Sequence, residues 1–421
     1  MTRGIRLLGM GIALGVLAMG VPVTDAVAAP KKEKEEQQAA PQQQLSQKVV
    51  KGLKAASDAM QKQDWETALA GIQEAQAVPD RKPYDDFQIA EMLGYVQLKR
   101  EKYAEAAAAF EQSLASGLLP ATETHDRLKL VTQLHLQLKN YPKAVEFGTR
   151  LLALTSSPPP DEQALVAQAR YLAGDYKGAV DGMTQAIDAA RKTGKPVEEN
   201  WLQVQLSGYV QLKDAPGVLA ALKELAVAYP KKNYLTDLFG QWKREQGDDR
   251  LVLNLYRVMF HLGLLEFSED YLKMAQLATD LGFPGEAITV LEKGNADKKF
   301  TDEVEQVQYK KQLASAKTLA VTDRKTVASL EQAGTKSGEE SAQLGLALAS
   351  YEQYDKAATA LKSGIDKGGV KRLDQAQIML GYSLVKLNRV DEAQAAFASV
   401  DPSSPLSTIA KLWAAYTKQP L

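Results

Sequence analysis

The sequence predicts an all-α fold, an α-solenoid of about ten helix–turn–helix repeats that ends in a C-terminal capping helix. Three observations lead to this prediction. A pair of small residues twelve positions apart recurs along the chain, Gly, Asp and Pro fall where helices must end or begin, and no segment shows a credible strand pattern. Within 421 residues, these features favour one extended array over several globular domains.

Composition excludes several classes of function. The chain has 51 Lys and Arg against 52 Asp and Glu, so it lacks the overall basic charge expected of a nucleic-acid-binding protein. It has no Cys, which excludes disulfide scaffolds, thiolate zinc sites and cysteine nucleophiles. Only three His are present, and we therefore expect neither metal nor cofactor chemistry.

Residues 1–28 have the three parts of a secretory signal peptide. Arg3 and Arg6 precede an uncharged apolar run over Leu7–Val23, and Ala26-Val27-Ala28 provides a small-residue cleavage site. An uncleaved membrane anchor is the alternative, although the apolar run is short for a span. The sequence thus predicts a periplasmic protein.

Residues 29–47 are rich in Lys, Glu, Gln and Pro and contain almost no apolar side chains. Such a segment cannot bury enough surface to offset the entropy lost on ordering. We predict a disordered linker here. The alternative is that its charges contact peptidoglycan or a membrane.

The repeat itself occupies residues 48–402. Its small residues, which we number positions 8 and 20 of each unit, allow the two helices of a hairpin to cross closely, and the mean spacing between units is about 36 residues. Position 8 is Ala56, Gly94, Thr132, Ala167, Gly208, Gly240, Ala275, Ser315, Gly345 and Gly381. Position 20 is Ala68, Ala106, Ala144, Ala179, Ala220, Val252, Ala287, Val327, Ala357 and Ala393.

Two further positions support the alignment. Five units carry an aromatic residue three places before position 20, namely Trp65, Tyr103, Tyr141, Tyr176 and Tyr354. Seven units have a large apolar residue at position 24, namely Ile72, Phe110, Met183, Tyr256, Leu291, Leu361 and Phe397. The pattern is weak at 231–262 and 303–333, where we expect helical hairpins of looser geometry.

Residues 403–421 contain one further amphipathic helix. Leu406, Ile409, Leu412 and Trp413 share one of its faces. Because the end of a solenoid must cover its last apolar face, we predict a capping helix. The alternative role for Trp413 is docking a partner.

The repeat resembles the tetratricopeptide-repeat family over about residues 49–400, most strongly in LGYVQLKREKYAEAAAAF from Leu93 and LGYSLVKLNRVDEAQAAF from Leu380. The resemblance implies a right-handed superhelix whose first helices line a concave groove for protein or peptide partners. Helix positions 2, 5 and 9 then supply the groove residues Gln88, Glu91, Tyr95, Lys129, Gln133, Gln168, Gln205, Tyr209, Gln241, Gln276 and Tyr382.

Tyr and Gln in such a groove suit extended peptide backbone, because they combine stacking area with amide donors and acceptors. The alternative is that they are tolerated exposed residues of a helix. Family members that clamp a C-terminal carboxylate use a Lys and Asn set. Here only Lys129 fits that set and no Asn occupies position 9.

We predict that the protein is not an enzyme. No phosphate-binding loop, zinc-protease motif or nucleophile elbow stands in a supporting context. His125-Asp126 resembles half of a metal site but is better explained as the start of a surface helix, and His261 lies in an apolar stretch typical of a core edge.

Three stretches, which begin at His125, Tyr271 and Leu380, resemble a subgroup of periplasmic tetratricopeptide proteins associated with TonB, ExbB and ExbD components. This resemblance implies an accessory scaffold in energy transduction to outer-membrane transporters. The alternative is an outer-membrane or cell-wall assembly factor in which the solenoid supports an envelope complex.

Overall fold

The computed structural model describes residues 44–243 and 248–418. Contacts divide the chain into two units, residues 1–45 and residues 46–421, and the helices lie in the second. The predicted signal peptide and nearly all of the predicted linker lie outside the described residues.

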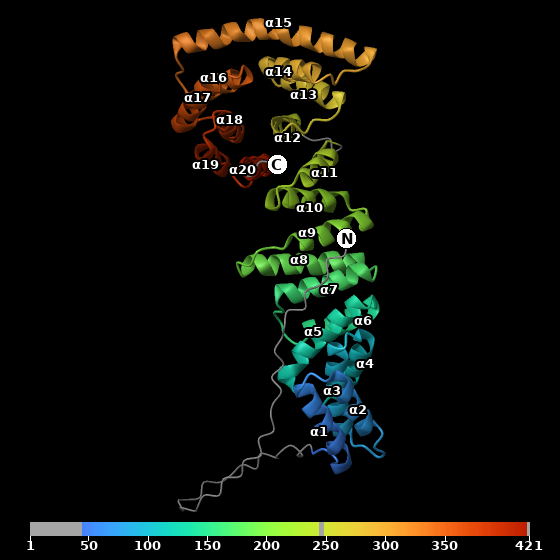
Figure 1. Ribbon diagram of the computed structural model, residues 1–421. Coiled ribbons are helices and arrows are strands. Elements are labelled where there is room, and N and C mark those ends of the chain that lie inside the picture. The colour runs from blue at the N-terminus through green and yellow to red at the C-terminus, as the bar shows by residue number, and fades with distance from the viewer. Residues whose placement is uncertain (1–43, 244–247, 419–421) are drawn as a thin grey trace, which may run out of the picture. The chain divides into compact units, whose positions relative to one another are not determined.

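The described residues form α-helices and no strands, which confirms the predicted all-α class. Eight neighbouring pairs pack as hairpins (Figure 1). They are α1 (Gln47–Gln61) with α2 (Trp65–Gln76), α3 (Pro83–Lys99) with α4 (Tyr103–Ser116), α5 (Ala121–Gln137) with α6 (Tyr141–Leu152), α7 (Pro160–Leu172) with α8 (Tyr176–Lys192), α9 (Glu199–Leu212) with α10 (Ala215–Ala228), α13 (Ser268–Asp280) with α14 (Pro284–Ala296), α16 (Gly338–Ser350) with α17 (Tyr354–Lys367), and α18 (Leu373–Lys386) with α19 (Val390–Ala398). The remaining helices are α11 (Lys232–Trp242), α12 (Asp249–His261), α15 (Glu303–Ala333) and α20 (Ser407–Lys418).

The hairpins are held by the predicted small residues. A Cβ atom at Gly94 would overlap the ring of Phe110, and one at Gly381 would overlap the ring of Phe397. The absence of a side chain at position 8 thus makes room for the large apolar residue sixteen places later, at position 24. Phe110 is fully buried as a result, which stabilises the hairpin by roughly 1.5–3 kcal/mol.

The hairpin turns share one backbone conformation. In each, the residue five places before position 20 has a positive φ, as Lys139 and Gly174 show. The next residue occupies the N-cap position of the second helix. At α8 it is Asp175, which accepts a hydrogen bond from the backbone N–H of Gly178 at 2.9 Å. The prolines predicted to separate the units lie between helices or at a helix start.

The pair α9–α10 differs from the predicted alignment by two residues. Its positive-φ residue is Lys213, and five places after it position 20 falls on Val218. Ala220, the residue predicted for that position, is exposed. A Cβ atom at Gly208 would meet Val180 of the preceding hairpin instead of α10. Gly208 is therefore small because α9 packs closely on α8.

The expected hairpin at 231–262 is also looser than the others. α11 packs on α10, and α12 packs on α13. A Cβ atom at Gly240 would meet no atom within 4 Å, so the predicted pair of Gly240 and Val252 holds no helix crossing. Residues 244–247 are not described.

The expected hairpin at 303–333 is wrong. Residues Glu303–Ala333 form one continuous helix of 31 residues, α15, which packs against α13, α14 and α16. Ser315 and Val327, predicted to face each other across a turn, lie in the same helix. Asp302 caps this helix by accepting a hydrogen bond from the N–H of Glu305 at 2.8 Å.

The C-terminal helix α20 buries the predicted apolar face. Trp413 is only 1% exposed and stacks on Phe397 of α19, which supports the capping role over partner docking. α20 also contacts α10, α12 and α18 (Figure 1). The Tyr416 hydroxyl donates a hydrogen bond to the carbonyl of Lys231 at 3.1 Å. The chain end thus joins helices that are far apart in sequence.

Candidate partner-binding face

Six of the predicted groove residues lie on the first helices of three successive hairpins, α3, α5 and α7. We call this set the A face, and it comprises Gln88, Glu91, Tyr95, Lys129, Gln133 and Gln168. Gln168 is exposed and the other five are partly exposed. The helical repeat therefore brings these six to accessible positions, although the residue-by-residue assignment of the groove stays a prediction.

Ion pairs connect these three helices in a regular way. Glu91 of α3 pairs with Arg127 of α5, and Lys129 of α5 pairs with Glu162 of α7 at 3.1 Å. In both cases a residue at position 5 contacts the residue at position 3 of the next unit. His125 also contacts Glu162 at 3.1 Å, so the buried carboxylate of Glu162 has two partners. The charges of the A face are largely neutralised within the protein.

Sequence reasoning missed Arg127 and Glu162, which orient two of the predicted residues. The signal was available, because opposite charges stand at positions 5 and 3 of adjacent units. Arg127 is buried, with its guanidinium 4.0 Å from the centre of the Phe110 ring. Burial raises the pKa of Glu91, whereas the charge of Arg127 opposes that rise.

His125 was predicted to be a surface residue at a helix start, and it is partly exposed near the beginning of α5. Its hydrogen bond with Asp126 raises the pKa of the imidazole, and Glu162 contributes in the same direction. Among the described residues no three His, Asp or Glu side chains are grouped so that they could hold a metal ion.

Two amides of the A face have no partner within the described structure. Gln133 and Gln168 occupy position 9 of α5 and α7, and neither forms a hydrogen bond with a described residue. Since neighbouring charges are paired with one another, these amides remain as free donors and acceptors.

Tyr95 occupies the same position on α3. Its ring meets Trp65 of α2 edge to face, with ring centres 6.1 Å apart, and the ammonium of Lys99 lies 5.4 Å from its centre. Beside Trp65, an open hollow of about 480 Å³ is lined by Gln63, Asp64, Trp65, Glu66, Arg100 and Lys102. Tyr95 is thus held by neighbours while part of its surface stays accessible.

Gln205 and Tyr209 do not occupy the predicted positions. The shifted alignment of α9 places Gln203 and Ser207 at positions 5 and 9 instead. Gln205 is buried and donates a hydrogen bond to Thr184 at 2.9 Å, and the ring of Tyr209 lies against Gly217. The motif Asp-x-x-Gly at Asp214–Gly217, which matches Asp175–Gly178, could have revealed the correct alignment.

Gln241 and Gln276 lie away from the A face, on α11 and α13. Gln241 is partly exposed, and exposed Gln276 donates a hydrogen bond to Asp280 on its own helix at 2.8 Å.

Tyr382 is buried rather than presented to a partner. It is 8% exposed and its ring contacts Tyr354, Trp413 and His261. Burial raises the pKa of its hydroxyl well above the ordinary value. The prediction failed here because α20 covers this part of α18, and no local sequence feature shows that contact.

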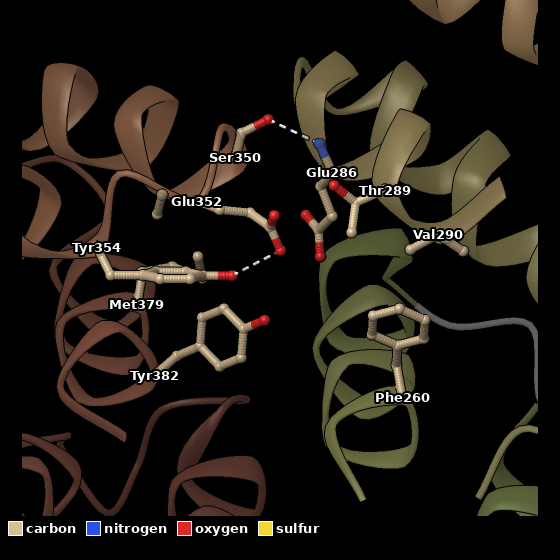
Figure 2. Close-up of a pocket in the computed structure, with 10 residues that line it drawn as sticks. Phe260, Glu286, Thr289, Val290, Ser350, Glu352, Tyr354, Met379 and Tyr382 are labelled. Atoms are coloured by element: carbon tan, nitrogen blue, oxygen red, sulfur yellow. Dashed lines mark hydrogen bonds between the residues drawn. The ribbon is translucent and has the colours of Figure 1, made fainter. Parts of the chain in front are cut away.

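A small cavity lies beside Tyr382 between α12, α14, α16, α17 and α18 (Figure 2). Figure 2 shows the carboxylates of Glu286 and Glu352 near each other in this cavity. Its volume of about 20 Å³ suits one water molecule, so the cavity is too small for a ligand.

Glu286 belongs to a buried polar network next to this cavity. Arg257 donates two hydrogen bonds to the carboxylate, at 2.7 and 2.6 Å. Arg257 also bonds to Asn254, which donates to Gln375 of α18 at 2.9 Å. These hydrogen bonds connect α12, α14 and α18, so the network holds the three helices together, although the amide nitrogen of Gln375 is buried without a partner among the described residues.

One family comparison supports the predicted resemblance. Residues 53–118 match the family model described as tetratricopeptide repeat, a segment that falls in the two hairpins α1–α4. No curated protein matches the sequence. The resemblance is therefore confirmed, with its direct sequence match in the first two hairpins.

Solved structures with partial likeness include other helical repeat proteins. A tetratricopeptide repeat protein from Parabacteroides merdae is 12% identical, covering 80% of this chain and 100% of that one, with a TM-score of 0.31. MamA from Desulfovibrio magneticus is 14% identical, covering 48% and 100%, with a TM-score of 0.31. The TPR2AB domain of yeast Sti1, in a pHSP90 complex, is 13% identical, covering 71% and 100%, with a TM-score of 0.26. Similarity at this level says nothing about what the present chain binds.

The described chain is a helical solenoid, and its first two hairpins match the tetratricopeptide-repeat model. No helix among the described residues combines the length and apolar character needed to cross a bilayer.

Proposed function

We propose that the protein is a non-enzymatic scaffold that binds an extended segment of a partner protein along the A face. The observation that carries this proposal is the uncharged row at position 9, in which Tyr95, Gln133 and Gln168 lie on the first helices of three successive hairpins. Neither amide is used by the described fold, and extended backbone offers amide and carbonyl groups that pair with such side chains.

The ion pairs beneath this row support an uncharged ligand segment. The ammonium of Lys129 is neutralised by Glu162, so it does not present a free charge to a C-terminal carboxylate. We therefore expect binding to depend on backbone hydrogen bonds and on apolar contact with Tyr95 rather than on a charged peptide end.

The test is a binding assay with peptides selected from a library of unstructured sequences displayed on phage. The double variant Gln133→Ala/Gln168→Ala should weaken binding about tenfold or more, as expected for two lost hydrogen bonds. A matched control is Gln112→Ala/Gln185→Ala, which removes two exposed amides from the second helices α4 and α8. Equal effects of the two double variants would argue against the A face.

We further propose that the scaffold acts in the periplasm. Support comes from the residues before α1, which combine a basic start, an apolar run and a small-residue cleavage site. N-terminal sequencing of the mature protein should find a start near Ala29, and cell fractionation should recover it with periplasmic markers. A mature protein that starts at Met1 in the cytoplasmic fraction would refute this assignment.

A role beside TonB, ExbB and ExbD components is the partner assignment that the resemblance of three stretches supports. Reversible crosslinking in intact cells, followed by isolation of this chain, should recover those components. The alternative is a cell-wall or outer-membrane assembly factor. Deletion of residues 30–47 should abolish co-sedimentation with the cell wall only under that alternative.

A further inference from the structure

The long helix α15 has a side that no described helix covers. α15 packs on α13, α14 and α16 (Figure 1). Ala316, Ala320 and Val327 are buried on its inner face. On the opposite face, Val304, Val307 and Val321 are 66%, 60% and 59% exposed. At about 100° per residue, Ala314 and Thr318 fall in the same outward sector as these valines.

These valines are unexpected on the exposed face of a helix. A β-branched side chain loses rotamer freedom in a helix, and that loss is normally offset by packing. Here the described fold provides no packing, so the fold alone does not account for the three exposed valines. Their spacing is close to that of an apolar seam between two helices, since Val307, Ala314 and Val321 follow one another at seven-residue intervals.

Along residues 304–328 the charges in and beside this seam have one sign, and exposed Glu303 at the start of α15 is the acidic residue outside that range. Lys310, Lys311 and Lys325 are exposed and form no ion pair with the described residues. Between Val304 and Ala328 the outward sector contains no acidic residue, because Glu305 accepts a hydrogen bond from Ser268 and Asp323 accepts one from Tyr351 at 2.6 Å. A partner that covers the valines must therefore compensate several lysines.

A second copy of the chain does not meet this requirement. Antiparallel pairing of two α15 helices about Thr318 sets Lys311 opposite Lys325, and parallel pairing sets each lysine opposite itself. Both arrangements bring like charges together across the seam. A bilayer is also disfavoured, since the seam lacks the Trp, Phe and Leu residues typical of helices that lie in a membrane surface.

We propose that the outward face of α15 binds an acidic amphipathic helix of a partner protein. The apolar side of that helix covers Val304, Val307 and Val321, and its flanking Glu or Asp residues pair with Lys310, Lys311 and Lys325. This surface is separate from the A face, so one chain can hold two partners.

The experiment measures binding of two fluorescent peptides to the full chain by anisotropy. Both peptides have four heptads, with Leu at the first and fourth position of each heptad. The positions that flank the leucines are Glu in the Glu peptide and Lys in the Lys peptide. The Glu peptide should bind saturably, at least tenfold more tightly than the Lys peptide, and its binding should weaken as salt rises.

Variants locate the binding surface. Val307→Gln/Val321→Gln and Lys311→Glu/Lys325→Glu should each weaken binding of the Glu peptide at least tenfold. Gln favours a helix more than Val does, so the first variant keeps α15 intact, which circular dichroism verifies. Leu319→Gln is the matched control, because Leu319 is 46% exposed and lies roughly 160° around the axis from Val321.

Three results would overturn the proposal. The first is that both peptides bind equally or that neither binds. The second is that Leu319→Gln weakens binding of the Glu peptide as much as the valine variant does. The third is that a second copy of the chain or a membrane occupies the face. The last would appear as a dimer in sedimentation that Val307→Gln/Val321→Gln dissociates, or as binding to phosphatidylglycerol vesicles that the same variant abolishes.

Discussion

At the scale of single residues, buried polar groups determine how stable the C-terminal half of the solenoid is. Arg257 is 1% exposed and its charge is balanced by Glu286. Arg257→Ala should lower the free energy of unfolding by about 3–5 kcal/mol, because it leaves a carboxylate without its partner. Arg257→Met/Glu286→Leu should be much less harmful. Urea unfolding followed by circular dichroism measures both, and equal losses would contradict the role of the pair.

His261 makes stability depend on pH. Burial lowers its pKa to about 4, and the nearby charge of Lys386 acts in the same direction. Between about pH 6.5 and 4 the unfolded chain binds a proton that the folded chain excludes, so stability falls as pH falls, by on the order of 2–3 kcal/mol. His261→Phe should reduce the difference in unfolding free energy between about pH 7 and about pH 4.5. An unchanged difference would show that other groups cause the loss.

At the scale of elements, the hairpin turn is the unit that determines alignment. Gly174 has φ of +86° and a Cβ atom there would meet nothing within 4 Å. Gly174→Ala should therefore lower the free energy of unfolding by about 1 kcal/mol, because alanine disfavours a positive φ. Lys139→Gly at the equivalent turn should be neutral or stabilising by a few tenths of a kcal/mol. Thermal unfolding compares them, and the account of the turns fails if Lys139→Gly is the more harmful of the two.

Some helices could be predicted from the sequence and others could not. The hairpin of Gly94 and Phe110 could be predicted because its small and large residues contact each other within one local motif. At α9 the small residue Gly208 serves a contact with α8, so the same pattern gave a wrong alignment. α15 could have been recognised, since no Gly or Pro interrupts 303–333, but the expectation of a regular repeat favoured a hairpin.

At the scale of the whole molecule, contacts between distant segments limit what a repeat pattern can reveal. The pattern predicted accessible positions for Gln133 and Gln168, because each depends only on its own hairpin and its neighbours, and their role in binding stays a prediction. It could not reveal the burial of Tyr382, because α20 reaches that position through contacts outside the repeat.

The contacts of α20 predict which helices lose stability when a residue of α20 is changed. Trp413→Ala should lower the free energy of unfolding by about 3–5 kcal/mol. It should also speed backbone hydrogen exchange in the helices that contact α20, which are α10, α12, α18 and α19. Exchange in α1–α4 should not change, because each hairpin of a solenoid depends on its neighbours. Mass spectrometry of exchanged peptides makes the comparison, and uniform acceleration along the chain would contradict it.

The central claim is that a partner binds along the first helices of the N-terminal hairpins. Site-specific photocrosslinking in the native cell tests it most directly, with a photoreactive residue placed at Tyr95, Gln133 or Gln168. The matched controls are Gln112 and Gln185, which are exposed on the second helices α4 and α8. We predict the same discrete crosslinked partner from the first three positions and none from the controls. Crosslinks of equal yield at the control positions, or no crosslink at any A-face position, would contradict the account.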